Sequence, residues 1–596
     1  MSPERDCTRD LNLLDLPHDI LSSIIHFLPP KSLFAFLSTC QSLQYDGTLH
    51  TSARYWRTNT VSKFRLPVYP VISEDGEHWK ELYRRMHTDT RLYNWGSNKS
   101  GLLGDVLRRS VPWPREITDR PFMHPVADIV CGGYFTAVLT TIGEVWMKGW
   151  GGWRQIRMSS HLTASDLHRQ HISTITQISA ARDGVICLAE SAVMWYCRLE
   201  ELEAHMVTTG IRVMKGGWTG LSAMRTPRPA REEDSGILVW TSLDGIIKHI
   251  PTAIPMTSPH RPDYAGEVIN WAMMRDYVLF VTRPGRVWAW HIAPYAANAT
   301  QVALPVELKR GDDAAHEDVA DVCGWLERFA LMMRNGEVLL GTTQMLKDYL
   351  DLGTPLKFEK IPALQNTGIV KIAFGDWHYH ALHKDGTITS YGHEPEGCGA
   401  FGLGDVNLSV MERGFSRDIV IRPECLTTGR RVHFEPEKQA WQLDLARSYT
   451  TDDQADVSWP GDGTRYEVSE WIEERLRAWA TPGNEVMIAP GHRAAGQEGS
   501  YHGARQDDTK RDEDPAYFVT SVAACGWHTV ALVLVDTAKA TEVARRYAEV
   551  QRDGAWAAPP RLQLLNGEEM PGSDPLRTWS RASGCPKPKP VEIVRW

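Results

Sequence analysis

The chain has 596 residues and a formal net charge of −9 at pH 7. This length allows a large core and more than one domain, and the acidic balance argues against a general nucleic-acid binder, whose surface is basic. No run of about 20 apolar residues occurs, so no membrane span is expected, and Met1 to Asp6 lack the apolar run of a secretory signal. The ten cysteines are scattered without paired spacing, which favours the reducing cytosol or nucleus.

A helical segment is expected first in the chain, over residues 11–58. Its apolar residues follow helical spacing, at Ile20, Leu21, Ile24 and Leu28. Three helices in about 45 residues bury little core on their own. We therefore expect this segment to bind a partner through apolar positions that remain exposed.

Proline and serine residues suggest where these helices begin and end. Pro17 fits the start of the first helix and Pro29-Pro30 its end. Ser32 is expected to cap a second helix that carries Leu33 and Leu37. Residues 59–90 are expected to form a linker.

The same segment resembles an F-box, by which substrate receptors attach to the Skp1 adaptor of SCF ubiquitin ligases. Leu16-Pro17 with Asp19 matches the family's Leu-Pro-x-Glu opening, with Asp in place of Glu, and Tyr55-Trp56-Arg57 matches its end. The resemblance implies docking on Skp1 and, through it, on cullin. The implied contact residues are Leu16, Pro17, Ile20, Leu21, Ile24, Leu28, Leu33 and Leu37. The alternative is that some of them form only the core of a small helical domain.

Seven copies of one phrase follow, over residues 91–536. Each has a short alternating apolar strand, a small residue, an aromatic residue or His, a second apolar strand, and often Asp-Gly or Asn-Gly. Turn glycines at 285, 336 and 386 lie roughly 50 residues apart, a spacing typical of a solenoid or propeller. Alternation bounded by such turns indicates hairpins.

The clearest copies begin at Val126 and Gly368, and they resemble the RCC1 repeat, the unit of a seven-bladed β-propeller. This resemblance makes Gly132, Gly375, His378 and His528 structural repeat positions. The expected fold is therefore mainly β: a seven-bladed RCC1-like β-propeller with a small N-terminal all-α F-box domain.

Ring closure is expected from the two incomplete repeats. Leu92-Tyr-Asn-Trp95 ends a repeat that has no beginning, and Val519 begins a repeat that has no end. The strand at 92–95 should complete the final blade, because closure protects strand edges.

Two further segments lie outside the repeat pattern. An insertion is expected over about 406–516, with an amphipathic helix at Ser469 to Trp479. A C-terminal tail is expected over 537–596, with a helix at Thr541 to Val550.

No residue pattern indicates chemistry. His378, His380 and His383 would suit a metal by their spacing, but His378 matches the repeat histidine, so we expect no metal, cofactor or catalytic residue. The hypothesis is a non-catalytic, cytoplasmic or nuclear receptor subunit of an SCF-type ubiquitin ligase, with Skp1 and an unknown protein substrate as partners, and neither nucleic acid nor membrane. The alternatives are a guanine-nucleotide exchange factor or a non-degradative scaffold of the RCC1-repeat family.

Overall fold

The computed structural model describes residues 16–39, 41–44, 52–66, 75–98, 102–103, 110–149, 151–158, 174–201, 203–225, 237–240, 252–253, 267–292, 305–308, 319–394, 398–404, 430–436, 439, 515–552 and 592–595. The chain forms two compact units, Met1–Asp89 and Thr90–Trp596. Each unit has a core of its own.

The first unit is all-α. Its helices are α1 (His18–Ile25), α2 (Pro30–Leu37), α3 (Gln41–Gln44), α5 (Ala53–Phe64) and α6 (Gly76–Thr88). The stretch 59–90, expected as a linker, instead contains the end of α5 and all of α6. Trp79 of α6 is buried in the same core as Trp56 of α5, which explains why this charged stretch is folded.

The start of α2 also differs from the expectation. The helix begins at Pro30, with Pro29 as its N-cap, so Ser32 lies inside it instead of capping it. The fixed φ of proline suits the first helical position, where the missing N–H has no intrahelical acceptor. Pro29-Pro30 therefore begins the second helix, after α1 has already ended at Ile25.

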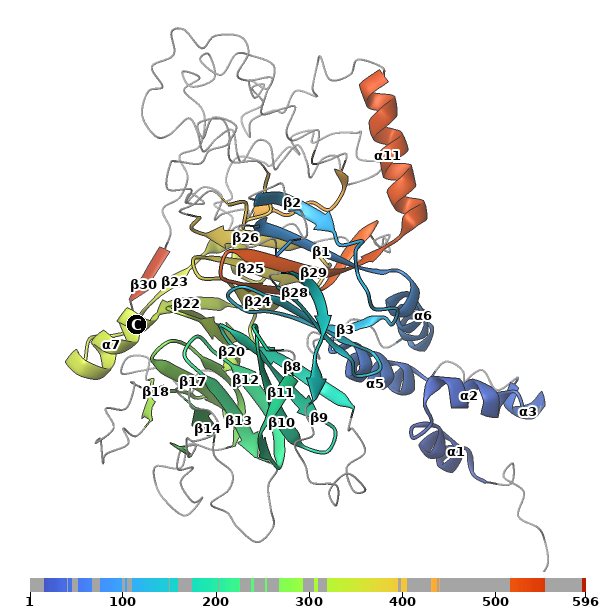
Figure 1. Ribbon diagram of the computed structural model, residues 1–596, viewed down its shortest axis with the longest axis horizontal. Coiled ribbons are helices and arrows are strands. Elements are labelled where there is room, and N and C mark those ends of the chain that lie inside the picture. Colours follow the sequence, from blue (N-terminus) through green and yellow to red (C-terminus); the bar gives the residue numbers. More distant parts are fainter. Residues whose placement is uncertain are drawn as a thin grey trace, which may run out of the picture. The chain divides into compact units, whose positions relative to one another are not determined.

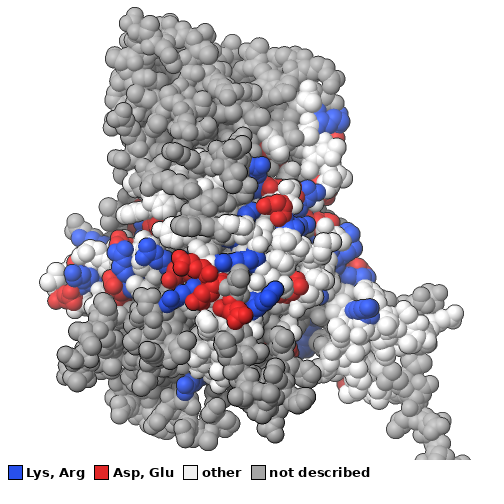
Figure 2. Space-filling view, in the orientation of Figure 1, with Lys and Arg blue, Asp and Glu red and all other residues white. Residues whose placement is uncertain are grey.

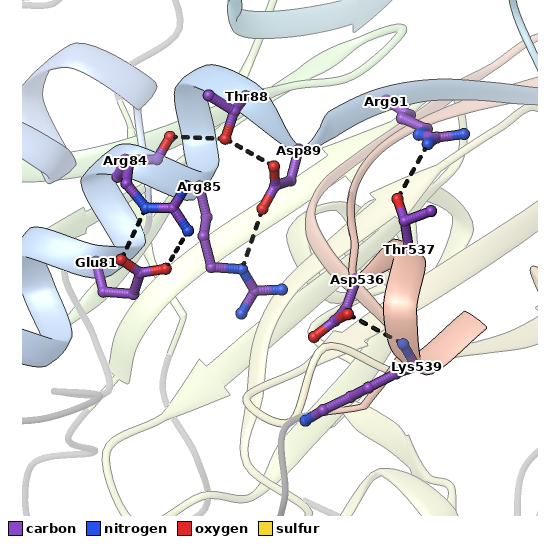
Figure 3. A network of polar contacts seen from close by, with 9 residues as sticks. All are labelled: Glu81, Arg84, Arg85, Thr88, Asp89, Arg91, Asp536, Thr537 and Lys539. Carbon is purple, nitrogen blue, oxygen red and sulfur yellow. Dashed lines mark hydrogen bonds and ion pairs between the residues drawn. The ribbon is translucent and has the colours of Figure 1, made fainter. Parts of the chain in front are cut away.

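Short-range polar contacts fix both ends of α6. The Asp75 side chain accepts a hydrogen bond from the Glu77 N–H at 3.0 Å, which satisfies one orphan donor of the first turn. In the last turns, Arg84 binds Glu81 and Arg85 pairs with Asp89 at 3.5 Å (Figure 3). Figure 3 also shows two contacts within the second unit, from Arg91 to Thr537 and from the Lys539 N–H to Asp536.

The second unit is a seven-bladed β-propeller, which confirms the expected fold (Figure 1). Each blade is an antiparallel sheet in which four strands follow one another from the innermost outward. The first three blades are β3 (Val126–Cys131), β4 (Thr136–Thr140), β5 (Val145–Gly149), β6 (Gly152–Gln155); β8 (Ile175–Ala180), β9 (Gly184–Ala189), β10 (Val193–Arg198), β11 (Glu203–Thr209); and β12 (Ile211–Gly216), β13 (Leu221–Arg225), β14 (Ile237–Trp240), β15 (Thr252–Ala253).

The remaining blades include the one that closes the ring. They are β16 (Val268–Met273), β17 (Tyr277–Thr282), β18 (Val287–His291), β19 (Val306–Glu307); β20 (Val319–Trp325), β21 (Arg328–Met333), β22 (Val338–Thr342), β23 (Lys357–Lys360); β24 (Ile369–Phe374), β25 (His378–His383), β26 (Ile388–Gly392), β27 (Arg430–Arg431); and β28 (Tyr517–Cys525), β29 (His528–Val535), β1 (Thr90–Ser97), β2 (Ser110–Glu116). Two blades carry a fifth strand: β7 (Arg157–Met158) pairs with β11, and β30 (Glu592–Arg595) pairs with β23.

The ring is closed by strands from opposite ends of the repeat region. β1 pairs with β29 in antiparallel register from Thr90↔Leu534 to Gly96↔His528, as the two incomplete repeats predicted. The innermost strands β28, β3, β8, β12, β16, β20 and β24 contact one another in an unbroken circle. Each innermost strand has a register irregularity near its start, as between Val126 and Asp128, and such bulges increase strand twist.

The predicted turn glycines take the backbone conformation that required them. Gly143, Gly285, Gly336 and Gly386 all have positive φ, between 75° and 89°, where glycine has no Cβ penalty. Gly245 lies outside the described residues.

The insertion and the tail are described only in part. Arg430–Arg431, inside the expected insertion of 406–516, forms β27 and so supplies the outer strand of a blade; the expected helix at 469–479 lies outside the described residues. In the tail, α11 spans Thr537–Arg552 and contains the expected helix. Further helices are α7 (Thr343–Leu352) and the 3-10 turn η3 (Pro362–Leu364).

One repeat end contains a buried carboxyl. In the repeat that ends in β1, Asn98 Oδ1 accepts a hydrogen bond from the Leu103 N–H at 2.7 Å. Glu394 holds the corresponding position after Tyr391-Gly392, and its Oε1 accepts from the Ala400 N–H at 2.5 Å. Burial raises the pKa of Glu394 to about 7, although backbone N–H groups of the loop act in the opposite direction.

Replacing Glu394 with Gln should stabilise the propeller above pH 7 and change little near pH 4.5. The folded pKa lies above the unfolded value, so the folded chain retains a proton that the unfolded chain loses, and stability falls as pH rises from 4.5 to about 7. The free energy of unfolding of the variant should exceed that of the parent by on the order of 3 kcal/mol at pH 8. Urea unfolding at both pH values measures it, with Glu190→Gln at an exposed turn as control; equal differences at the two pH values would contradict this account.

Candidate functional site

Helix α1 and the turn that follows it carry two adjacent apolar rows, and one of them faces the core of the helical unit. This inner row has i, i+4, i+7 spacing: Leu21 and Ile25 are buried, and Leu28 packs against the same cluster as Ile25. Leu33 and Leu37 of α2 are also buried there, with 0% and 1% of their surface exposed. The inner row therefore holds α1 against α2 and α5.

The outer row lies one residue earlier in the chain and has no comparable cover. Ile20 is 44% exposed, Ile24 is half-buried, and Phe27 is 87% exposed. Phe34 of α2 is also 44% exposed, although its ring lies 5.8 Å from that of Trp56. We call Ile20, Ile24, Phe27 and Phe34, with Pro17, the outer face. Exposed apolar groups on a small helical unit are typical of a protein-binding surface.

A buried tyrosine fixes the turn that presents Phe27. The Tyr55 hydroxyl donates a hydrogen bond to the Leu28 carbonyl at 2.8 Å. Burial, with a smaller contribution from Tyr83, raises the pKa of Tyr55, so its hydroxyl remains a donor. This hydrogen bond ties the turn that carries Phe27 to α5.

The propeller presents a second surface, formed by the loops between the first and second strands of its blades. Neighbouring loops are joined by hydrogen bonds: Gly133 N–H to the Arg182 carbonyl at 2.7 Å, Arg275 N–H to that of Leu326 at 3.0 Å, and Asp376 N–H to that of Gly526 at 3.0 Å. We call these loops, at 132–135, 181–183, 217–220, 274–276, 325–327, 375–377 and 526–527, the loop ring. Such joined loops form a rigid platform, and loops are where propellers of any family vary without loss of the fold.

The loop ring is closed by further contacts between its members. Thr219 Oγ1 donates to the Arg275 carbonyl at 2.7 Å, and Trp325 Nε1 donates to Asp376 at 3.2 Å. Gly526, with φ of +55°, lies so near Gly133 that an added Cβ would be 2.6 Å from the Gly133 oxygen. Arg182 Cζ lies 4.3 Å from the Trp218 ring centroid, so contacts run between successive loops around the whole circle.

The repeat histidines lie between blades. His378 Nε2 is 3.1 Å from Thr529 Oγ1, and His528 Nε2 is 3.3 Å from Thr136 Oγ1, in each case on the next blade around the ring. Gly132 and Gly375 leave room for the ring three residues later: an added Cβ at Gly375 would be 2.2 Å from the His378 ring. His380 and His383 also have hydrogen-bond partners, Thr529 and Thr389.

Within the described part of the chain, no group of three His, Cys, Asp or Glu residues is placed to hold a metal ion. Among the described helices, none combines the length and the apolar character that crossing a membrane requires. Burial raises the pKa of Cys131 to about 12, so this thiol stays protonated.

Comparison with known proteins matches both units. Residues 13–45 match the F-box domain, and residues 89–139 match the regulator of chromosome condensation (RCC1) repeat. The F-box protein pof9 of Schizosaccharomyces pombe is 24% identical over 449 residues, which cover 71% of this chain and 86% of pof9.

The chain combines an F-box with RCC1-type repeats.

Solved structures that the chain resembles share little sequence with it. Prp20p of Saccharomyces cerevisiae is 12% identical with a TM-score of 0.43, and covers 80% of this chain and 98% of its own. Human WBSCR16 is 13% identical with a TM-score of 0.42, and covers 75% and 99%.

The F-box residues expected to contact Skp1 fall into two groups. Pro17 and Ile20 are exposed, and Leu16, Ile24 and Leu28 are half-buried. Leu21, Leu33 and Leu37 are buried within the F-box unit itself. Their placement in the unit's own core is the alternative that the sequence had left open for some of these residues.

Two exposed residues of the F-box outer face, Phe27 and Phe34, are absent from the expected set. The sequence does contain a pattern that points to Phe27. Ile20, Ile24 and Phe27 have the same helical spacing as the inner row, Leu21, Ile25 and Leu28, shifted by one residue. Phe34 had no such signal, since both Leu33 and Phe34 are apolar and only packing decides which one is inside.

On the face of the RCC1-type propeller that Figure 2 shows, Lys and Arg side chains are interspersed with Asp and Glu. A mixed surface of this kind lacks the single-sign field that attracts a polyanion.

Proposed function

We propose that the F-box outer face docks on Skp1 and that the propeller holds a protein substrate, so that the chain acts as a substrate receptor of an SCF-type ubiquitin ligase. F-box proteins as a family are generally non-catalytic adaptors. The mechanism is proximity: the receptor raises the effective concentration of substrate lysines near the charged ubiquitin-carrying enzyme and makes no bond itself.

The observation that carries this proposal is the pair of apolar rows on α1 and the turn that follows it. The inner row, Leu21, Ile25 and Leu28, already supplies the helical unit's own core. The outer row, with Ile20 at 44% and Phe27 at 87% exposed, contributes little to that core. An exposed aromatic and aliphatic patch on a rigid helix pair suits burial against an apolar groove of a partner protein.

Replacing Ile20 with Asp, alone and together with Phe27→Ser, is expected to weaken Skp1 binding at least roughly 100-fold, because a charge would be buried in the apolar interface. Leu16→Ala with Pro17→Ala should act in the same direction. The measurement is recovery of purified Skp1 on the immobilised chain, then titration calorimetry. Ile142→Asp, at a propeller isoleucine that is 49% exposed, is the matched control.

Undiminished Skp1 binding by Ile20→Asp, with helical circular dichroism unchanged, would overturn the assignment of the outer face. In a separate recovery from cell extract, cullin recovered together with Skp1 supports a ligase, whereas Skp1 without cullin would indicate a non-degradative scaffold. Recovery of a small GTPase in place of both would indicate an exchange factor.

A further inference from the structure

The loop ring concentrates aromatic and arginine side chains at one face of the propeller. Two guanidinium groups lie near the Trp218 ring: Arg182 Cζ is 4.3 Å and Arg275 Cζ is 5.9 Å from its centroid. The Trp325 ring is 6.2 Å away and nearly perpendicular, at 79°. These four residues come from four different blades, so the cluster forms only in the folded ring.

The two arginines beside Trp218 differ in their partners. Arg275 Nη1 binds Glu327 Oε1 at 2.7 Å. Arg182 is exposed. The Asp376 carboxyl interacts with it electrostatically, but within the described residues no carboxylate lies within ion-pair distance of its guanidinium. The adjacent Asp183 instead accepts a hydrogen bond from the Tyr196 hydroxyl at 2.8 Å.

Arg275 shows what a guanidinium at this cluster binds. A guanidinium that lies over an aromatic ring keeps donors for a planar carboxylate, and such charge-assisted bonds are the stronger kind. Arg182 lies closer to the same ring and has no carboxylate within ion-pair distance among the described residues. A carboxylate from a bound molecule would therefore complete at Arg182 the arrangement that Glu327 completes at Arg275.

Exposed aromatic rings lie in the same set of loops. Tyr134 is 48% and Trp377 is 41% exposed. Tyr134 follows Gly133, whose N–H binds the Arg182 carbonyl, so its loop adjoins Arg182 directly. Tyrosine, tryptophan and arginine are the residue types that dominate binding energy at protein interfaces.

We infer that the loop ring binds a protein segment that presents an Asp or Glu side chain to Arg182 and an apolar or aromatic side chain beside it. This inference deepens the proposed function, on which it rests, by stating the chemistry of the substrate. Preorganised loops favour affinity, because little conformational freedom is lost on binding.

The test is selection of random 12-residue peptides, displayed on phage, against the immobilised full chain. Peptides with an acidic residue next to an apolar one should be enriched. A fluorescein-labelled synthetic copy of the most enriched peptide should then bind Arg182→Ala roughly 10- to 100-fold more weakly in anisotropy titrations. Arg182→Lys should bind with intermediate affinity, and selection on Arg182→Glu should enrich basic residues.

Arg283→Ala is the control, because Arg283 is an exposed arginine between β17 and β18, outside the loop ring. It should bind the peptide like the parent, and melting temperatures should agree among all variants. The inference would be overturned if no peptide were enriched, or if the enriched peptides lacked acidic residues. It would also be overturned if Arg182→Ala bound the peptide as tightly as the parent chain. Tighter binding of a labelled U12 oligonucleotide that also depends on Arg182 would overturn it as well and indicate nucleic acid.

The two proposals fail separately. Skp1 recovery is measured on the same preparations, and Arg182→Ala should retain it. If the parent chain does not bind Skp1 but still enriches acidic peptides, the ligase role is wrong and the peptide-binding surface stands. If it binds Skp1 but enriches no acidic peptides, only the inference about the surface is wrong.

Discussion

Deleting residues 1–97 is expected to prevent the propeller from folding, whereas deleting residues 1–89 should leave its melting temperature nearly unchanged. The longer deletion removes β1, which pairs with β29 on one side and β2 on the other. It also removes Leu92, Tyr93 and Trp95, which are 1%, 6% and 0% exposed. Their burial is worth about 10 kcal/mol together, which is comparable with the whole stability of a domain.

The measurement is differential scanning calorimetry of both truncations, with size-exclusion chromatography for aggregation through the exposed β29 edge. Trp95→Ala in the full chain is a milder change. Trp95 Nε1 donates to the Ala400 carbonyl at 3.0 Å, and its ring packs against His380 and Phe434 of the neighbouring blade. The substitution should lower stability by about 3–5 kcal/mol. Equal melting temperatures for the two truncations would show that β1 does not close the ring.

Replacing Thr529 with Val should destabilise the propeller by about 2–4 kcal/mol, since two buried ring nitrogens lose one partner. Thr529 Oγ1 lies 3.1 Å from His378 Nε2 and 3.0 Å from His380 Nε2. Thr529 is 0% exposed, and valine conserves its shape. Urea unfolding measures the loss, and Thr209→Val at an exposed position of β11 should cost little; if both variants were equally stable, the hydroxyl would carry no such role.

The buried histidines His380 and His528 predict how the stability of the propeller depends on pH. Burial lowers the pKa of His380 to about 3 and that of His528 to about 4. Between pH 6.5 and 4 the unfolded chain therefore binds protons that the folded chain does not, so stability falls as pH falls and is fully present above about 6.5. Glu394 acts in the opposite direction, which is why its effect is measured as a difference between variant and parent.

The blades could be predicted from sequence where local signals exist. Glycines such as Gly336 and Gly386 marked the hairpin turns, and the half-repeat at Leu92 to Trp95 revealed ring closure. Outer strands such as β15 and β27 are two residues long, and only pairing with a neighbour defines them. No periodicity can show elements of that length.

In the helical unit a regular spacing of apolar residues is present, but it does not show which of them are buried. Trp79 and Met86 of α6 are buried seven residues apart. The charged residues between them obscure this spacing, so the sequence predicts a linker over 59–90. For α1 the sequence predicts a helix that binds a partner but not which apolar row faces inward, because both rows have the same period. The cluster around Trp218 joins residues of four blades, so no local pattern contained it.

Ring closure by β1 also sets an order of events on the ribosome. The partner strand of β1 begins about 430 residues after β1 ends, which at 5–20 residues per second takes roughly 20 to 90 s to synthesise. During that time the F-box is complete, while β1 has β2 beside it but lacks its partner β29 on the other side. Nascent chains should therefore offer their F-box to a partner before the propeller exists, and should depend on chaperones to shield β1 until the last blade emerges.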